Sequence, residues 1–365
     1  MRPRLERPDP DGAGSVRFSR HGEIGAWRSL EKAPAKKLHF EGAQVGGRCI
    51  LNTEQGLGVQ SGNSSLLMRD VLISGIAKAL IPCARLAVQR SPCFRRSLWS
   101  GFVAGRLSWR DYPFRKCAHF GAVFTGNTID TIQRHIYYFN RWDPEVETAI
   151  CARLKPGDTF IDIGANIGYF SLLASKLVGP CGHVVSIEAS ASTFAILNEH
   201  LEGNAATGNV RAIHAAVADQ EGTFTLHTGP KDNCGMASLI RSEDQGCEEL
   251  AGAPLGALLS DDEMRTARLI KIDVEGAEGM VIDGMLPVLP KLAACEILIE
   301  ISPELTSARS IINTLVSGGW RPYVIEHREY PDNYLQSAGQ NSLTPLRGVP
   351  ESKVDVLFRP EATSA

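Results

Sequence analysis

The sequence predicts an α/β fold, in which a mostly parallel sheet carries helices on both faces and a helical region precedes the sheet. After residue 157, short apolar segments alternate with helical segments, and the apolar segments are nearly continuous, as in strands buried on both faces. The last two predicted strands have no helix between them. They are therefore expected to form an antiparallel hairpin that closes the sheet.

The individual elements follow from the periodicity of apolar residues. The predicted strands are residues 159–164, 183–189, 210–217, 223–228, 268–274, 296–301, 321–327 and 354–359. Helices are predicted at about 168–178, 191–203, 277–289 and 304–318, between these strands. A long loop, residues 328–352, separates the last two strands.

The composition divides the chain into three regions. Residues 1–66 are rich in Gly, Pro and charge and predict a poorly ordered extension. Residues 67–150 are predicted to be mainly helical and to form a cap, and residues 151–361 are predicted to form the α/β domain. Met68 opens the first periodic segment, so a start of translation there is a hypothesis, which the intact mass of the natively expressed protein would test.

Charge and cysteine usage predict a cytoplasmic protein. The net charge of −3 gives no global attraction to nucleic acid or to a membrane surface. The nine cysteines include no CxxC pair, which indicates reduced, mostly buried thiols rather than disulfides or a zinc site. The first residues lack the apolar core of a secretory signal, and no stretch of about 18 apolar residues predicts a membrane span.

The segment DTFIDIGANIGYF, residues 158–170, is the first candidate for a binding site. In an open α/β sheet the ligand lies beyond the carboxyl ends of the strands, and this segment runs from a strand through a turn into a helix. Gly164 and Gly168 let the chain turn tightly and let a ligand approach the backbone, while Asp162 places a carboxylate at the strand tip.

Two further carboxylates point to an adenosine-type ligand. Glu188 ends the second strand, where an acidic side chain can accept both hydroxyls of a ribose. Asp219 follows the third predicted strand and is placed to reach the adenine amino group. The ordinary alternatives are a solvated charge for Glu188 and a turn residue for Asp219.

The ligand could be a dinucleotide or S-adenosylmethionine. A dinucleotide turn needs a middle glycine and favours nearby basic residues, whereas here Asn166 occupies the middle and nothing close is basic. The Tyr-x-x-x-Lys pair of short-chain dehydrogenases should lie downstream, but the match Tyr112 to Lys116 lies upstream. These observations favour S-adenosylmethionine.

Several motifs in order resemble the FkbM family of S-adenosylmethionine-dependent methyltransferases. They are GDTFIDIGANIGYFSLLAS, IEASASTFAILNEHL, AAVADQEGTFTL, LIKIDVEGAEGMVIDGM and ILIEIS, within about 137–302. The resemblance implies a seven-stranded class I methyltransferase fold and O-methylation of a hydroxyl on a glycan, a lipid-linked sugar or a secondary metabolite. The EASAS segment departs from the family, which more often has a proline after the glutamate.

The resemblance also implies roles for individual residues. The implied cofactor contacts are Asp162, Gly164, Ala165, Asn166, Gly168, Glu188 and Asp219. The fourth strand tip, KIDVEGAE, then faces the methyl group, with Asp273 as the preferred base and Glu275 as the second choice. Lys271 lies on the same face of the strand as Asp273, and Ile270 and Ile272 lie on the other.

Three questions stay open at this level. Asp273 and Glu300 end adjacent strands and could share a Mg²⁺, although a metal is not favoured. The basic, aromatic segment 85–116 could form a groove for an anionic or sugar acceptor, or for RNA, but a solvated basic face over a helical core is the simpler interpretation. Asp273-Val274-Glu275 lacks the proline motif of enzymes that methylate base amino groups. A non-catalytic cofactor-binding protein is the remaining alternative.

Overall fold

The computed structural model describes residues 79–89, 95–107, 110–227, 239, 246–304, 306–328, 330–335 and 342–361. These residues all belong to one compact unit, Val59–Ala365. The predicted extension 1–66 and the hypothesis about Met68 lie outside the described residues.

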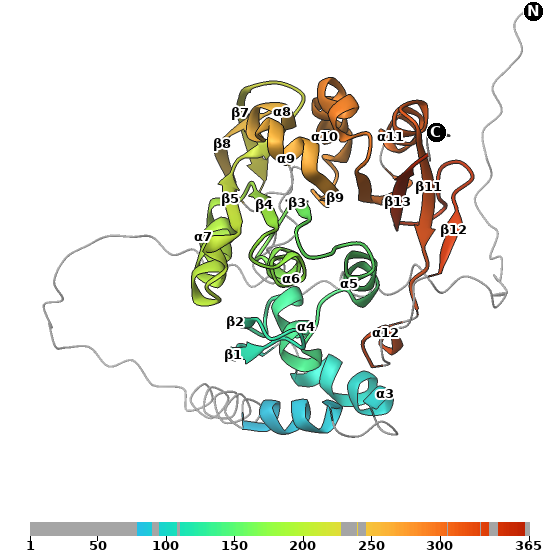
Figure 1. Cartoon of the computed structure of the whole chain (residues 1–365). Coiled ribbons are helices and arrows are strands. Elements are labelled where there is room, and N and C mark those ends of the chain that lie inside the picture. Colours follow the sequence, from blue (N-terminus) through green and yellow to red (C-terminus); the bar gives the residue numbers. More distant parts are fainter. Residues whose placement is uncertain are drawn as a thin grey trace, which may run out of the picture. The chain divides into compact units, whose positions relative to one another are not determined.

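The central sheet has eight strands rather than the expected seven (Figure 1). In spatial order they are β12 (Leu343–Pro345), β11 (Trp320–Ile325), β13 (Val354–Pro360), β10 (Glu296–Ile301), β9 (Ala267–Ile272), β3 (Thr159–Ile163), β4 (His183–Glu188) and β5 (Val210–His214). Strands β10, β9, β3, β4 and β5 are parallel, and β13 pairs antiparallel with both β10 and β11. The extra strand, β12, is a three-residue edge strand formed by the long loop before β13.

A second, three-stranded sheet corrects two of the predicted strands. It consists of β6 (Ala216–Val217), β7 (Gly222–His227) and β8 (Cys247–Ala253), in the order β6-β8-β7. The predicted strand 223–228 therefore lies outside the central sheet, and the predicted strand 210–217 is divided at Ala215. The Ala215 N–H donates to the Glu188 carbonyl (3.2 Å), so the chain leaves the central sheet beside the end of β4.

Alternate residues of the central strands belong to two different cores. Phe160 and Leu269 pack with α4 (Thr131–Phe139), α5 (Pro144–Cys151), α6 (Tyr169–Val178) and α7 (Ala191–Gly203). Ile161 and Ile270 pack on the other face with α8 (Leu255–Leu258), α9 (Asp261–Thr266), α10 (Glu278–Met285), the 3₁₀ helix Leu286–Leu292 and α11 (Ala308–Ser317). Successive side chains of a strand point to opposite faces, so one apolar strand supplies both cores.

The region before the sheet is mainly helical, as predicted, and it also contains a hairpin that the sequence did not predict. It contains a helix at 79–89, α3 (Arg95–Leu98), a π-helix (Trp99–Leu107) and a hairpin of β1 (Pro113–Cys117) and β2 (Val123–Asn127). Gly121, at φ 87°, lies in the turn of that hairpin, and only a residue without a Cβ takes this conformation at little cost. Phe124 of β2 is fully buried and stacks on Tyr169 of α6, so this region shares a core with the central sheet.

Helices α4 and α5 begin at polar caps. The Asp130 carboxylate accepts from the Gln133 N–H at the start of α4, and Asn140 ends that helix in a left-handed conformation. Asp143 caps α5 by accepting from the Val146 N–H (3.2 Å), and Pro144 fills the first turn, where its missing N–H costs nothing.

The structure tests two predictions, that the cysteines are mostly buried and that no helix spans a membrane. All six described cysteines are free, but five of them are exposed and Cys295 alone among them is buried, so the expectation of mostly buried thiols is wrong. Within the described ranges, no helix has both the length and the apolar character needed to cross a bilayer.

Candidate active site

A pocket opens where β3, β4 and β9 end, at the carboxyl edge of the central sheet. Its lining is acidic at three positions, Glu188, Asp273 and Glu275. The backbone of the turn after β3 and the apolar segment 215–217 complete much of the wall. The second sheet also contributes, through Leu226, so this sheet closes one side of the pocket.

The turn after β3 depends on glycine for a packing reason. Gly164 has φ 78°, and a Cβ at this position would lie 1.9 Å from the Asp273 carbonyl oxygen. The N–H groups of Gly164 and Ala165 donate to the Ile187 carbonyl (2.9 and 3.0 Å), which fastens the turn to β4. Asn166 follows at φ 50°, and its amide oxygen accepts from the Ile167 N–H (2.7 Å). The turn is thus held tightly between the ends of β4 and β9.

Glu188 is buried at the end of β4, 7% exposed. Its carboxylate accepts from the Asn166 N–H (2.8 Å) and from the Ser190 N–H (2.8 Å). Burial raises the pKa of Glu188 to about 7, against the lowering effect of these two N–H groups. Each carboxylate oxygen can accept more than one hydrogen bond, so Glu188 keeps acceptor capacity toward the pocket that it lines.

The sequence predicts that Asp162 contacts the cofactor directly. In the structure Asp162 is fully buried and does not line the pocket. Its Oδ2 accepts from the Ser171 hydroxyl (2.7 Å), and its Oδ1 has no hydrogen-bond partner. The Lys271 ammonium lies 3.9 Å from Oδ1. Burial raises the pKa of Asp162, and Lys271 opposes this rise. Asp162 therefore supports the strand tip from behind the pocket.

Lys271 and Asp273 lie on one face of β9, as their spacing predicts, and form an ion pair. The Lys271 ammonium is 3.2 Å from Asp273 Oδ2 and 5.2 Å from the Phe170 ring centroid. Burial lowers the pKa of Lys271, but Asp273 and Asp162 outweigh it and hold the pKa above its ordinary value. Lys271 consequently stays charged and orients Asp273, and it cannot serve as a base near neutral pH.

Glu275 and Glu300 both pair with Lys353, and the sequence did not predict this ion pairing. The Lys353 ammonium lies 3.6 Å from Glu275 Oε2 and also pairs with Glu300 Oε2. Burial and the nearby Asp273 raise the pKa of Glu300 to about 8. Lys353 lies in the long loop just before β13, so no local motif marks it.

The remaining predicted cofactor contacts lie outside the pocket lining. Ala165 is buried beneath the turn, and Gly168, at φ 86°, caps α6 where a Cβ would lie 2.6 Å from Leu197 Cδ1. Asp219 is exposed beyond β6 rather than at the end of a central strand. Its predicted contact with adenine finds no support in this position, because the chain departs from the central sheet at Ala215.

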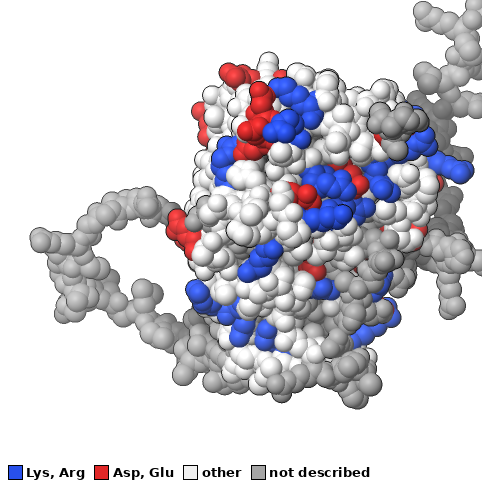
Figure 2. Space-filling model, in the orientation of Figure 1, with Lys and Arg blue, Asp and Glu red and all other residues white. Residues whose placement is uncertain are grey.

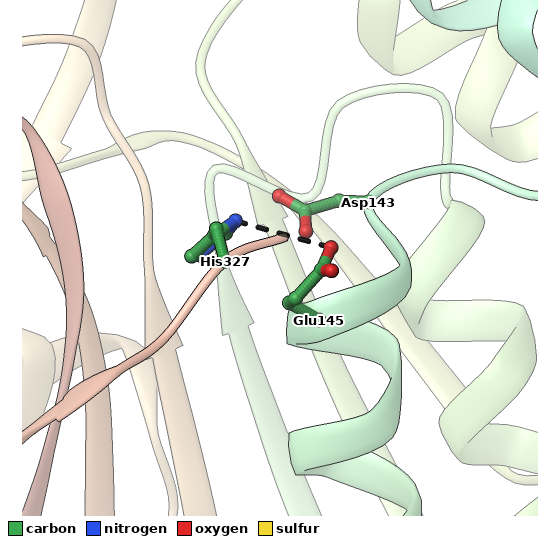
Figure 3. A group of neighbouring side chains, drawn as sticks. All are labelled: Asp143, Glu145 and His327. Atoms are coloured by element: carbon green, nitrogen blue, oxygen red, sulfur yellow. Dashed lines mark ion pairs between the residues drawn. The ribbon is translucent and has the colours of Figure 1, made fainter. Parts of the chain in front are cut away.

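A second cluster of ionisable side chains lies farther along the carboxyl edge, and it has no sequence signal. Asp143 and Glu145 at the start of α5 lie near His327, which follows β11, and one ligand atom from each lies within 4.8 Å of the others (Figure 3). His327 Nε2 is 2.7 Å from Asp355 Oδ2. Burial and Asp355 raise the pKa of Asp143 to about 7. Burial lowers the pKa of His327, but Asp355, Asp143 and Glu145 together outweigh it and raise this pKa to about 9.

The comparison with protein families decides between the possible ligands. Residues 162–333 match the model of the Methyltransferase FkbM domain. This region of the chain is thus similar to the methyltransferase domain of the FkbM family. This assignment confirms the resemblance seen in the sequence and supports S-adenosylmethionine-dependent methyl transfer, and the fold is that of a class I methyltransferase with one additional edge strand.

The solved structures that resemble this chain are distant. An FkbM methyltransferase from Methylobacillus flagellatus KT shows 13% identity, covering 63% of this chain and 55% of its own, with a TM-score of 0.35. A SAM-dependent O-methyltransferase from Thermotoga maritima shows 14% identity over 69% of this chain and 79% of its own, also with a TM-score of 0.35. A precorrin-6y C5,15-methyltransferase from Geobacter metallireducens GS-15 shows 17% identity over 60% and 87%, with a TM-score of 0.34. Such scores carry no argument about the substrate.

Among curated protein sequences, none matches this chain.

Proposed function

We propose that this protein transfers the methyl group of S-adenosylmethionine to a hydroxyl oxygen of a glycan, a lipid-linked sugar or a secondary metabolite. The observation that carries the proposal is the placement of three carboxylates around one pocket. Glu188 lies at the end of β4, and Asp273 and Glu275 follow β9. One carboxylate can thus hold the donor while another receives the proton of the acceptor.

The residues around the pocket fit S-adenosylmethionine. Glu188 accepts the ribose hydroxyls, and the turn after β3, which lines the pocket through Gly164 and Asn166, holds the methionine part. The apolar segment 215–217 provides a surface for the adenine ring. When bound, the cofactor supplies a methyl group on a positively charged sulfur, which is open to attack by an oxygen nucleophile.

Asp273 is the residue that takes the proton from the attacking hydroxyl. Its ion pair with Lys271 fixes the carboxylate, and its side chain is 40% exposed, so an acceptor can reach it. Glu275 is the second candidate. A positioned base contributes about 10²- to 10⁴-fold to the rate, and holding the two reactants in contact supplies about 7–11 kcal/mol.

A Mg²⁺ at Asp273, Glu275 and Glu300 is possible but not favoured. One carboxylate oxygen from each of the three lies within 4.8 Å of the others. The ammonium of Lys353 already pairs with Glu275 and Glu300, and it would have to be displaced. Turnover that persists in excess EDTA would exclude an essential Mg²⁺ here.

RNA is the main alternative acceptor. The basic segment 85–116 gives this alternative little support. Arg85 donates to the Tyr137 carbonyl (2.6 Å) and to Asn140 Oδ1 (2.7 Å), and Arg96 pairs with Asp332 (3.3 Å). Trp99 is buried, so it offers no platform for a base. On the face in view, Figure 2 shows Lys and Arg in separate groups, some beside Asp and Glu, rather than in one continuous basic stripe. RNA binding that weakens as salt is added would revive this alternative.

A cofactor-binding protein without catalytic activity is the second alternative. It predicts that S-adenosylmethionine binds while no acceptor is ever methylated. The carboxylates beside the methyl-donor pocket argue against it, because a protein that only binds the cofactor needs no base.

The deciding experiment supplies radiolabelled S-adenosylmethionine and fractionated cell extract to the full chain. We expect label in a glycan, lipid-linked sugar or small-metabolite fraction, at an oxygen, and label in RNA alone would contradict the proposal. Asp273→Asn should lower turnover by about 10²- to 10⁴-fold while cofactor affinity stays unchanged. Asp283→Asn, at an exposed position of α10, is the matched control and should have normal turnover.

A further inference from the structure

We propose that Asp143, Glu145 and His327 bind one divalent first-row transition ion, and that Asp355 orients the imidazole for this purpose. This site lies apart from the methyl-donor pocket, since none of the four residues lines that pocket. The three ligands come from the start of α5 and from the segment after β11, which are far apart in the sequence (Figure 3).

The distance between His327 and Glu145 is the first reason. Their atoms Nδ1 and Oε2 are 3.9 Å apart, which is too long for a direct hydrogen bond. Two ligand atoms that each lie about 2.1 Å from one ion are separated by roughly 3–4.2 Å, depending on the angle at the ion. The side chains of Asp143, Glu145 and His327 therefore need to move by only a few tenths of an ångström to share an ion, since one ligand atom from each lies within 4.8 Å of the others.

The contacts behind the ligands are the second reason. Histidines that bind metals usually donate their other ring N–H to a carboxylate, which fixes the tautomer. His327 Nε2 is 2.7 Å from Asp355 Oδ2, and this leaves Nδ1 directed at Glu145. Glu145 is itself held, because its oxygens accept from the Arg328 N–H (3.3 Å) and from the Asn333 amide (3.3 Å).

The charge and the donor types indicate the kind of ion. Three carboxylates, those of Asp143, Glu145 and Asp355, lie around the imidazole of His327, and this set of donor atoms suits a divalent cation. Two carboxylates and one imidazole suit Mn²⁺, Fe²⁺ or Zn²⁺ rather than Ca²⁺. Such an ion would join the start of α5 to the end of β11, so it should stabilise the fold.

The test measures binding of Mn²⁺ to the full chain after removal of bound metals, from the electron paramagnetic resonance signal of the free ion. Mn²⁺ is chosen because the nine cysteines would bind Zn²⁺ at unrelated places. We expect one Mn²⁺ per chain and a higher melting temperature in its presence. Asp143→Asn should weaken binding at least about tenfold while it keeps the cap of α5, because an Asn side chain accepts equally well at that position. Asp355→Asn, which acts through the imidazole, should weaken binding by about 10- to 100-fold.

Two controls separate this site from others. His183→Gln removes a histidine of similar exposure, 38% against 35%, that also pairs with a carboxylate, and it should leave Mn²⁺ binding unchanged. Glu300→Gln should likewise leave it unchanged. Absence of Mn²⁺ binding by the wild type would overturn the proposal, and so would binding that survives in Asp143→Asn but disappears in Glu300→Gln.

Discussion

The carboxylates at the two edges of the central sheet differ in their cationic partners and in their pKa values. At the amino edge, where the parallel strands begin, Glu296 meets Arg153 (2.6 Å), Arg268 (3.4 Å) and Arg359 (3.5 Å). Glu263 meets Arg211 (2.6 Å) and His183 (2.9 Å) in the same way. Burial raises the pKa of Glu263, but its hydrogen bonds from Arg211, Ser260 and His183 outweigh burial and lower the pKa to about 2.

At the carboxyl edge the carboxylates outnumber the cations. Burial raises the pKa of Glu188 to about 7 and of Glu300 to about 8. Lys271 and Lys353 are the lysines paired with this edge in the described part of the chain. Raised carboxyl pKa values cost stability and are typical of functional sites. At the amino edge, by contrast, the carboxylates are paired with cations, as in an arrangement that only stabilises the fold.

The largest effect is expected at Gly164. Gly164→Ala should destabilise the fold by more than about 3 kcal/mol and abolish cofactor binding, because the new Cβ would lie 1.9 Å from the Asp273 carbonyl oxygen. Gly157→Ala is the matched control: Gly157 also has a positive φ (92°), but a Cβ there would meet nothing within 4 Å. That variant should lose only about 1–2 kcal/mol, the cost of the left-handed conformation. Equal losses in thermal unfolding would show that the close approach to β9 is not decisive.

The next effect tests the amino edge. Glu296→Gln should destabilise the fold by about 2–4 kcal/mol, because Arg153, with a side chain 10% exposed, would lose its ionised partner. Affinity for S-adenosylmethionine should not change, since this edge is remote from the pocket. Asp262→Asn breaks the exposed pair with Arg265 and should change the free energy of unfolding by less than about 0.5 kcal/mol. Chemical denaturation would measure the free energies of unfolding, and calorimetry would measure cofactor affinity. A loss of cofactor affinity in Glu296→Gln would contradict the expectation that the amino edge serves stability alone.

The smallest effect is a pH dependence at Glu188. Its pKa near 7 means that the carboxyl is protonated below pH 7 in the free protein and ionised above it. Only the ionised form accepts both ribose hydroxyls, so affinity for S-adenosylmethionine should rise about tenfold from pH 6 to pH 8. Glu188→Gln should bind about 10- to 100-fold more weakly than wild type at pH 8 and should lose this pH dependence. A wild-type affinity that is flat over this range would argue against Glu188 as the ribose ligand.

Several residues that line the pocket could be predicted from the sequence, because they are close in the chain or follow strand tips. Gly164, Asn166 and Glu188 line the pocket, and Asp273 lies opposite them at the end of β9. A strand period of two also placed Lys271 beside Asp273. Asp162 and Asp219 show the limit of this reasoning, since a strand tip identifies a neighbourhood but not the direction in which a side chain points.

The alternation of strands and helices and the glycine turn after β3 could be predicted from the sequence alone, because each depends on a pattern within one short segment. The absence of a predicted helix between the last two strands also indicated their antiparallel pairing. The three-dimensional structure was needed to show that the segment after β5 turns away into a second sheet and that a hairpin precedes α4. It also brought Lys353 to Glu300 and His327 to Glu145. Those pairs join residues from distant parts of the chain, and their proximity arises from the order of strands in the sheet, which no local pattern encodes.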